Sequence, residues 1–192
     1  MTPGADPAAL LGEIHAKVVV CVKCRLSEGR TLAVPGEGAP NAQIVFVGEA
    51  PGREEDLEGR PFVGAAGKLL TRLLSEIGIQ RSEVFITNVV KCRPPGNRDP
   101  LPDEIAACRP YLLGQLRAIR PRAVCTLGRF AAHTLIDPGL AMSNCHGRSY
   151  RKNGVLLVPL LHPAAALHNQ EWLGVMHRDM GKLKLLLKRE LA

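Results

Sequence analysis

Four short apolar runs alternate with amphipathic segments along this chain, and this alternation narrows its possible folds more than any other feature. The runs cover residues 43–47, 84–87, 123–127 and 155–160. Each is rich in Val, Ile or Leu, as strands covered on both faces usually are. Strands that alternate with helices form parallel sheets with helices on both faces. The sequence therefore predicts a three-layer α/β/α fold around a four-stranded parallel sheet.

The intervening segments carry apolar residues at helical spacing. Over residues 66–77 they recur at steps of three and one, and Gly78 offers a C-terminal stop. A second stripe covers residues 105–119, where Pro110 predicts a kink or a later start. Two further helices are expected, a short one over residues 129–136 and a last one that includes residues 175–187. With no repeat and no linker, we expect a single domain over residues 1–192.

The formal net charge of +7 is spread along the chain and is not held in a basic tail. A positive field of this kind attracts polyanions. Nucleic acid is therefore the first partner to consider, although many basic enzymes bind small anions instead. Charge by itself leaves both possibilities open.

Segment 1–7 lacks the basic and apolar regions of a secretory signal peptide. The longest apolar stretches, such as residues 155–161, are too short to span a bilayer. We therefore expect a cytosolic protein without a membrane partner. In such a protein, six cysteines favour metal binding over a disulfide framework. Cys125, inside a predicted strand, is expected to be a small buried hydrophobe, and Cys145 receives no role.

Cys21 and Cys24 form a CxxC pair, and Cys92 and Cys108 follow later in the chain. Four thiolates at these positions suit either zinc or a [4Fe–4S] cluster, and their spacing does not decide between the two. A zinc ribbon usually closes with a second CxxC, which this chain lacks. A redox dithiol is a further alternative, but the CxxC precedes the first strand instead of opening a helix after it.

Ligands of open parallel sheets bind beyond the carboxyl ends of the strands, so the residues that follow each run are the candidates for a site. The first run leads into two Gly- and Pro-containing segments, 48–52 and 59–64. Their backbone amides would suit a planar or anionic ligand. No GxGxxG or GxxxxGK[ST] pattern is present, which removes the usual signatures of dinucleotide and nucleoside triphosphate sites.

Three further side chains stand at or near strand ends. Asn88 follows the second run, and its amide offers both a donor and an acceptor that can read the edge of a base. His162 follows the fourth run and is held extended by Pro163. Taken singly, Asn88 is more often a turn residue, His162 a structural histidine and Phe62 a core residue.

Together these segments resemble the family 4 uracil-DNA glycosylases of bacteria and archaea. The resemblance rests on an ordered set from about residue 20 to residue 170, in which GEAPG, GRPFVG, TNVVKCRPP and LHP are the most specific pieces. Its further members are the CxxC pair, Asn97 and the LPDE segment 101–104. The resemblance implies the uracil-DNA glycosylase fold and an enzyme that flips uracil from DNA and hydrolyses its C1′–N1 glycosidic bond.

The resemblance also implies roles for individual residues. A [4Fe–4S] cluster would be held by Cys21, Cys24, Cys92 and Cys108. His162 would donate to the uracil O2, Asn88 would read the polar edge of the base and Phe62 would stack on it. Glu49 would line the pocket as a third catalytic residue, together with the substrate-binding residues Ala50, Glu55 and Asn97. Because Ala50 stands where related families have an Asp, we expect a dissociative mechanism without a side-chain base at that position.

The expected substrate is uracil-containing DNA, single- or double-stranded, bound by a monomer associated with the nucleoid. Lys91, Arg93 and Arg98 lie on a loop at the active end of the sheet and are expected to contact phosphates. Leu167 is the candidate wedge for the gap left by the flipped base. The alternatives are a non-catalytic iron–sulfur DNA-binding module and a redox carrier. The first would have an eroded pocket, whereas the pocket residues are all present here.

Overall fold

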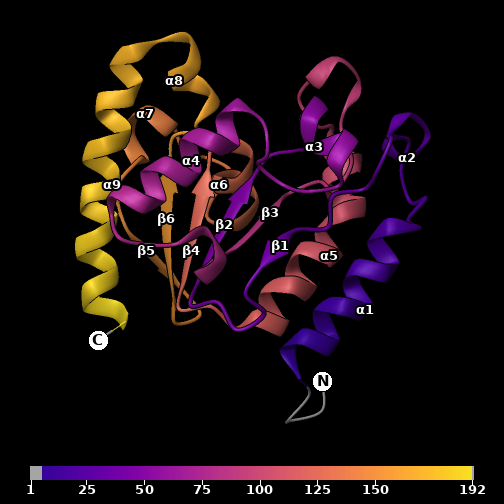
Figure 1. Cartoon of the computed structure of the whole chain (residues 1–192), viewed down its shortest axis with the longest axis horizontal. Helices are drawn as coiled ribbons and strands as arrows, with labels where there is room; N and C mark the ends of the chain where they lie inside the picture. Colours follow the sequence, from indigo (N-terminus) through magenta and orange to yellow (C-terminus); the bar gives the residue numbers. More distant parts are fainter. Residues whose placement is uncertain (1–5, 192) are drawn as a thin grey trace.

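The computed structural model describes residues 6–191 and contains a six-stranded sheet between two layers of helices (Figure 1). The strands are β1 (Glu37–Gly38), β2 (Ile44–Gly48), β3 (Phe85–Asn88), β4 (Ala123–Leu127), β5 (Tyr150–Lys152) and β6 (Val155–Leu160), in the spatial order β1-β3-β2-β4-β6-β5. The four central strands are parallel and match the predicted runs to within one residue. The three-layer α/β fold is confirmed. Residues 1–5 and 192, which the predicted domain and the signal-peptide argument include, lie outside the described residues.

The prediction of four strands was incomplete, because β1 and β5 add an antiparallel strand at each edge of the sheet. Each has two or three residues, too few to form a recognisable apolar run. β1 fits against β3 through a very close backbone approach. A Cβ atom on Gly38 would lie 2.0 Å from the Val84 carbonyl oxygen, so this position requires glycine.

The two faces of the sheet bury separate hydrophobic cores. Along β2, Ile44 and Phe46 contribute to one core, and Val45 and Val47 to the other. This alternation follows from the two-residue period of a strand. A strand covered on both sides is therefore apolar at most positions, and this is the reason why the central strands could be predicted from the sequence.

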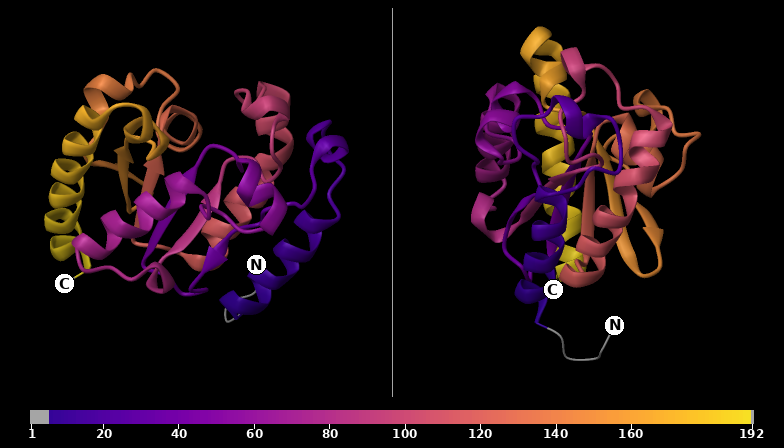
Figure 2. Two further views of the ribbon diagram at one scale, coloured as in Figure 1. Left: turned by 45° about the horizontal axis from the view of Figure 1, so that its top comes forward. Right: turned by 90° about the vertical axis from the view of Figure 1, so that its right-hand side faces the viewer.

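Helices α4 (Ala65–Glu76) and α9 (Gln170–Leu191) cover the first face, and α5 (Pro102–Ile119) and α6 (Arg129–Leu135) cover the second. Figure 2 shows α4 and α5 on opposite sides of the sheet. Helix α1 (Pro7–Val19) packs on α5. Of the two outcomes predicted from Pro110, a kink or a later start, the later start was wrong, because α5 begins at Pro102 and runs on through Pro110.

The remaining elements are short: α2 (Leu26–Gly29), α3 (Arg53–Glu58), α7 (Met142–Cys145), α8 (Ala164–His168) and the 3-10 turns η1 (Arg81–Glu83) and η2 (Pro95–Asn97). Figure 1 shows α3 and α8 at the end of the sheet opposite the two chain termini. There β2, β3 and β6 deliver Gly48, Asn88 and the segment that leads to His162. No helix in the described part of the chain is long and apolar enough to cross a membrane.

Candidate active site

A pocket of about 420 Å³ opens at the carboxyl ends of β2, β3 and β6. Its size falls in the range of small-molecule sites. The structure brings eight of the residues predicted for substrate, catalysis or DNA into its wall: Glu49, Ala50, Glu55, Phe62, Asn88, Asn97, Arg98 and His162. It also adds small wall residues that the sequence analysis did not single out, Pro51, Gly52, Ala66, Pro94 and Ala164. These lie within or beside the matched segments, and they limit the width of the pocket.

Asn88 is the last residue of β3 and lies opposite Gly48 of β2 in the parallel register. Its side chain is 1% exposed, and its Oδ1 atom has no hydrogen-bond partner within residues 6–191. A Cβ on Gly48 would lie 2.4 Å from that oxygen, so only glycine leaves room for the amide. A buried amide oxygen without a partner is costly, which makes it a candidate for binding a ligand donor.

Phe62 forms an aromatic wall of the same pocket. Its ring lies 5.7 Å from the His162 ring, measured between centroids, at an interplanar angle of 34°. The Phe62 backbone has a φ of 52°, in the left-handed region that non-glycine residues rarely adopt. Helix α4 can pack on this residue because position 67 is glycine. A Cβ there would lie 1.8 Å from the Phe62 carbonyl oxygen.

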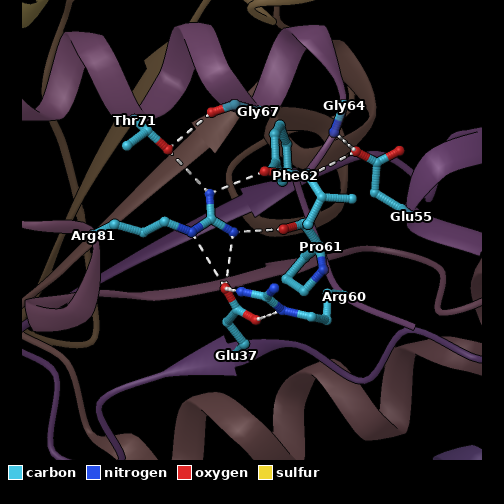
Figure 3. Close-up of polar contacts among 10 residues, drawn as sticks. Glu37, Glu55, Arg60, Pro61, Phe62, Gly64, Gly67, Thr71 and Arg81 are labelled. Atoms are coloured by element: carbon cyan, nitrogen blue, oxygen red, sulfur yellow. Dashed lines mark hydrogen bonds and ion pairs between the residues drawn. The ribbon is translucent and has the colours of Figure 1, made fainter. Parts of the chain in front are cut away.

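Glu55 joins the two loops that flank the pocket. Its Oε1 accepts hydrogen bonds from the backbone amides of Val63 and Gly64, both at 2.9 Å (Figure 3). Its Oε2 accepts from the Gly52 backbone amide at 3.1 Å. The carboxylate is thus already occupied by three backbone donors. Its direct contribution is to hold the loops 48–52 and 59–64 together, while a role in substrate binding stays a prediction.

His162 is held as a neutral imidazole. Burial lowers its pKa to about 4, although the negative charge of Glu55 opposes this shift. The Ala164 backbone amide donates to Nδ1 at 3.2 Å, so the proton of the neutral ring is placed on Nε2. Near neutral pH the residue therefore offers one uncharged N–H donor to the pocket.

Glu49 is the carboxyl group with the most perturbed ionisation in the pocket. Burial, assisted by the negative charge of Asp99, raises its pKa to about 7, and Arg129 opposes the shift. Arg129 itself is paired with Asp99. Glu49 consequently exchanges its proton near neutral pH, as acid–base groups in active sites often do.

The prediction that Lys91 contacts DNA was wrong. The side chain is 1% exposed, and its Nζ donates to the Asn88 carbonyl oxygen at 2.8 Å and to Gln115 Oε1 at 2.7 Å. A further bond to Thr87 completes its coordination by neutral oxygens. Burial lowers its pKa to about 8, although the Cys108 thiol opposes this. Because the ammonium is enclosed, it supports the backbone beneath Asn88 and has no access to a phosphate.

The other predicted DNA contacts stay predictions, with different surroundings. Arg98 places its guanidinium on the buried Glu104 carboxylate, with N–O distances of 2.6 and 2.9 Å. Arg93 is half-buried and donates to Asn97 Oδ1 at 2.8 Å. Leu167 projects from α8 with 47% of its surface exposed, outside the pocket wall.

A second, smaller cavity is lined by Cys21, Cys24, Cys92 and Cys108. Arg30 donates to Cys92 Sγ at 3.1 Å, and the Lys91 backbone amide donates to Cys108 Sγ at 3.2 Å. Burial raises the pKa of the Cys92 thiol and raises that of Cys108 to about 11, against the pull of these donors. The two remaining cysteines lie elsewhere. Cys125 is buried in β4 as predicted, and Cys145 is buried at the end of α7.

A parallel sheet that holds an unpaired amide, an aromatic wall and a neutral imidazole at its carboxyl end defines an α/β protein with a site for a small planar, hydrogen-bonding ligand. The Uracil DNA glycosylase superfamily matches residues 35–182, and this chain belongs to that superfamily.

Curated relatives extend along most of the chain. A type-4 uracil-DNA glycosylase of Sulfurisphaera tokodaii is 49% identical in an alignment that covers 92% of this chain and 84% of that protein. The type-4 enzyme of Saccharolobus solfataricus is 51% identical over 89% of this chain and 83% of its own. The type-4 enzyme of Thermotoga maritima is 43% identical over 94% and 96%.

Proposed function

We propose that this protein is a uracil-DNA glycosylase of the type-4 kind, which extrudes uracil from DNA, hydrolyses the C1′–N1 bond and so begins base excision repair. The observation that carries the proposal is the pocket itself. It combines the buried, unpaired Asn88 amide with the Phe62 ring and the neutral His162 donor. The names of the relatives point to the same reaction.

Asn88 supplies the means to recognise the base. Uracil presents an N3–H donor beside the O4 acceptor, and an Asn side chain presents an acceptor beside a donor. Cytosine has an acceptor at N3 and an amino group at C4, so it cannot satisfy the same amide orientation. The Lys91 ammonium donates to the Asn88 backbone carbonyl oxygen and so holds the backbone that carries this amide. Discrimination then comes from leaving a buried polar group unpaired with the wrong base.

His162 supplies the means to stabilise the leaving group. As the glycosidic bond lengthens, negative charge develops on uracil and positive charge on the sugar. The Nε2–H of His162 would donate to O2 where that negative charge accumulates, and a fixed donor in a dry site is worth several kcal/mol (about 3–4). Because the ring is neutral before the reaction, its hydrogen bond strengthens as the charge grows.

Electrostatic stabilisation of the sugar cation, more than a general base, would assist the attack of water. Ala50 has no carboxylate, and the nearby Glu49 carries a pKa of about 7. In its ionised form Glu49 would stabilise the sugar cation and accept a hydrogen bond from the incoming water. The mechanism would then be dissociative, and Glu49 would take part in catalysis through its charge.

The four cavity cysteines fit the [4Fe–4S] cluster implied by the family. They line one cavity, two of the sulfurs receive N–H donors, and thiolates are the usual ligands of such clusters. Within residues 6–191 no three His, Cys, Asp or Glu side chains converge on a single ion, whereas a cluster takes each thiolate at a separate iron. When bound, the cluster would cross-link the CxxC segment to the β3–α5 loop and to α5.

The substrate is proposed to be DNA, single- or double-stranded, bound by a monomer in the cytoplasm at the nucleoid. The net charge of +7 favours it. A base inside a duplex must be extruded before it can enter a pocket of this depth. Residues 1–192 would act as one domain. Arg93 would contact the DNA backbone, and Leu167 would fill the gap left by the flipped base.

A release assay tests the proposal. Purified protein is incubated with matched oligonucleotides that carry uracil, cytosine or thymine at one position, and free base and abasic sites are measured. We expect release of uracil and none of cytosine or thymine. Binding of uracil-containing DNA without release would instead support the non-catalytic iron–sulfur module, and neither binding nor release would overturn both.

A further inference from the structure

Phe62 holds its ring at the pocket wall from a backbone conformation that is unfavourable for a non-glycine residue. Such a conformation persists when its surroundings fix it. Glu55 does not fix it, because this carboxylate bonds within residues 59–64 only to the amides of Val63 and Gly64, which follow Phe62 in the chain. The carbonyl groups of Pro61 and Phe62 need another partner.

Arg81 is that partner (Figure 3). One guanidinium nitrogen, Nη1, donates to the Phe62 carbonyl oxygen at 3.0 Å, and the other, Nη2, donates to the Pro61 carbonyl oxygen at 2.6 Å. The planar fork thus holds two consecutive peptide groups at fixed separation, which a lysine ammonium cannot do. Arg81 is 20% exposed and belongs to η1, beyond the end of α4 and outside all the matched motifs.

Glu37 orients Arg81 from the opposite side. Its Oε1 accepts from Arg81 Nη2 at 3.1 Å, while Arg60 donates to Oε2 at 2.7 Å. Burial disfavours the ionised form of Glu37, but the hydrogen bonds from Arg60 and Arg81 outweigh it and hold the pKa of this carboxyl below its ordinary value. Glu37 lies in the edge strand β1, so this strand supports the aromatic wall through Arg81.

Helix α4 closes the arrangement. Gly67 lies directly against the Phe62 carbonyl group, and Thr71 one turn later donates to the Gly67 carbonyl oxygen at 3.0 Å and accepts from Arg81 at 3.4 Å. The Phe62 peptide is therefore held between α4 and the Arg81 guanidinium. Three elements that are separate in sequence, β1, α4 and η1, thus fix the backbone conformation of the loop 59–64.

We propose that Arg81, oriented by Glu37, is a positioning residue for base capture: it holds the Pro61–Phe62 backbone so that the Phe62 ring stays at the pocket wall and stacks on uracil. This proposal rests on the proposed function, because it assigns Phe62 a base to stack on. Arg81 itself does not line the pocket.

The test measures the affinity for free uracil by calorimetry in the full-length protein. Stacking of one base on an aromatic ring has an effect of about tenfold in affinity. Arg81→Met should weaken uracil binding by about that factor, Arg81→Lys by less, and Glu37→Gln by less again. Affinity for uracil-free DNA should not change. Arg72→Met is the matched control, since Arg72 lies on α4 and pairs with Glu76 away from the pocket.

A double-mutant cycle separates positioning from general stability. If Arg81 acts through the ring, Arg81→Met should have no further effect on uracil affinity in a Phe62→Ala background, whereas its effect on the melting temperature should persist. Equal loss of affinity in both backgrounds, or a lower melting temperature with unchanged affinity, would overturn the proposal. If Arg81→Met does not fold, Arg81→Lys takes its place in the cycle.

Failure of the proposed function looks different. The wild-type protein would then bind no uracil, and Phe62→Ala would have nothing to weaken. If wild type binds uracil and Phe62→Ala weakens it while Arg81→Met does not, the positioning proposal alone fails.

Discussion

The pocket and the cysteine cavity lie at the two ends of one short segment, yet folding completes them to different degrees. In the pocket, backbone amides hold the Glu55 and His162 side chains, and the Arg81 guanidinium holds the Phe62 carbonyl oxygen. In the cavity, burial raises the pKa of the Cys92 and Cys108 thiols, although Arg30 and Lys91 oppose the shift. The pocket is preorganised by the chain itself, whereas in the cavity the proposed cluster would supply the charge that stabilises buried thiolates.

Segment 88–92 connects the two regions. Lys91 supports the Asn88 carbonyl through its ammonium and contacts Cys108 through its backbone amide, and Cys92 follows directly. Substitutions in the pocket should therefore alter the rate of uracil release with little effect on the free energy of unfolding. Substitutions in the cysteine cavity should lower the free energy of unfolding with less effect on release.

The largest effect is expected from His162→Ala. Losing one preorganised donor should slow uracil release by roughly 10²–10³ in single-turnover assays. Its melting temperature and its binding to uracil-free DNA should stay near those of wild type, because phosphates provide that binding. Release at a near-normal rate would contradict the assignment of His162 to the leaving group.

Cys92→Ala should act mainly on stability. The cluster would close a long loop between the CxxC segment and the β3–α5 loop, and loss of such a cross-link costs about 2–3 kcal/mol. Protein purified without air should contain about four irons per chain, and the variant fewer, with a lower denaturation midpoint. Cys145→Ala is the control and should keep its iron. One equivalent of zinc without iron would show that the cluster assignment is wrong.

A smaller effect should come from the ionisation of Glu49. The rate should rise with pH and level off above about pH 7, because the ionised carboxylate stabilises the sugar cation. His162, with a pKa of about 4, stays neutral over this range and does not contribute. Glu49→Gln should lower the rate and flatten the profile, and an unchanged profile in this variant would exclude Glu49 as its source.

The same shift has a stability consequence of the opposite sign. Because burial raises the pKa of Glu49 above its ordinary value of 4.5, the folded protein binds this proton more tightly than the unfolded chain does. The resulting stabilisation is fully present below pH 4.5 and is lost as pH rises through about 7. Denaturant midpoints should therefore fall less with pH in Glu49→Gln than in wild type.

Sequence reasoning found the parts of this molecule that depend on burial patterns and strand ends. The central strands were predictable because both of their faces are buried, and Asn88 and His162 because chain order places them at strand exits. The resemblance supplied the roles proposed for these residues. Lys91 was assigned wrongly, since a basic residue in a loop carries no signal that tells an enclosed ammonium from an exposed one.

Arg81 and Glu37 were missed for a different reason. Arg81 bonds to main-chain carbonyls, whose presence is the same for every residue type, so no side-chain pattern marks the contact. Glu37 lies in a strand of two residues, which leaves no periodicity. A tertiary structure is needed to place these residues beneath the aromatic wall.

The left-handed backbone at Phe62 has a consequence for anyone who wishes to transplant this pocket into another sheet. Grafting the loop 59–64 would carry the ring but not the means of keeping it in place. Gly67 would have to be transferred with it, because any larger residue would collide with the Phe62 carbonyl. Arg81 and Glu37 would have to be transferred as well. The aromatic wall therefore depends on a three-dimensional patch assembled from four separate stretches of chain.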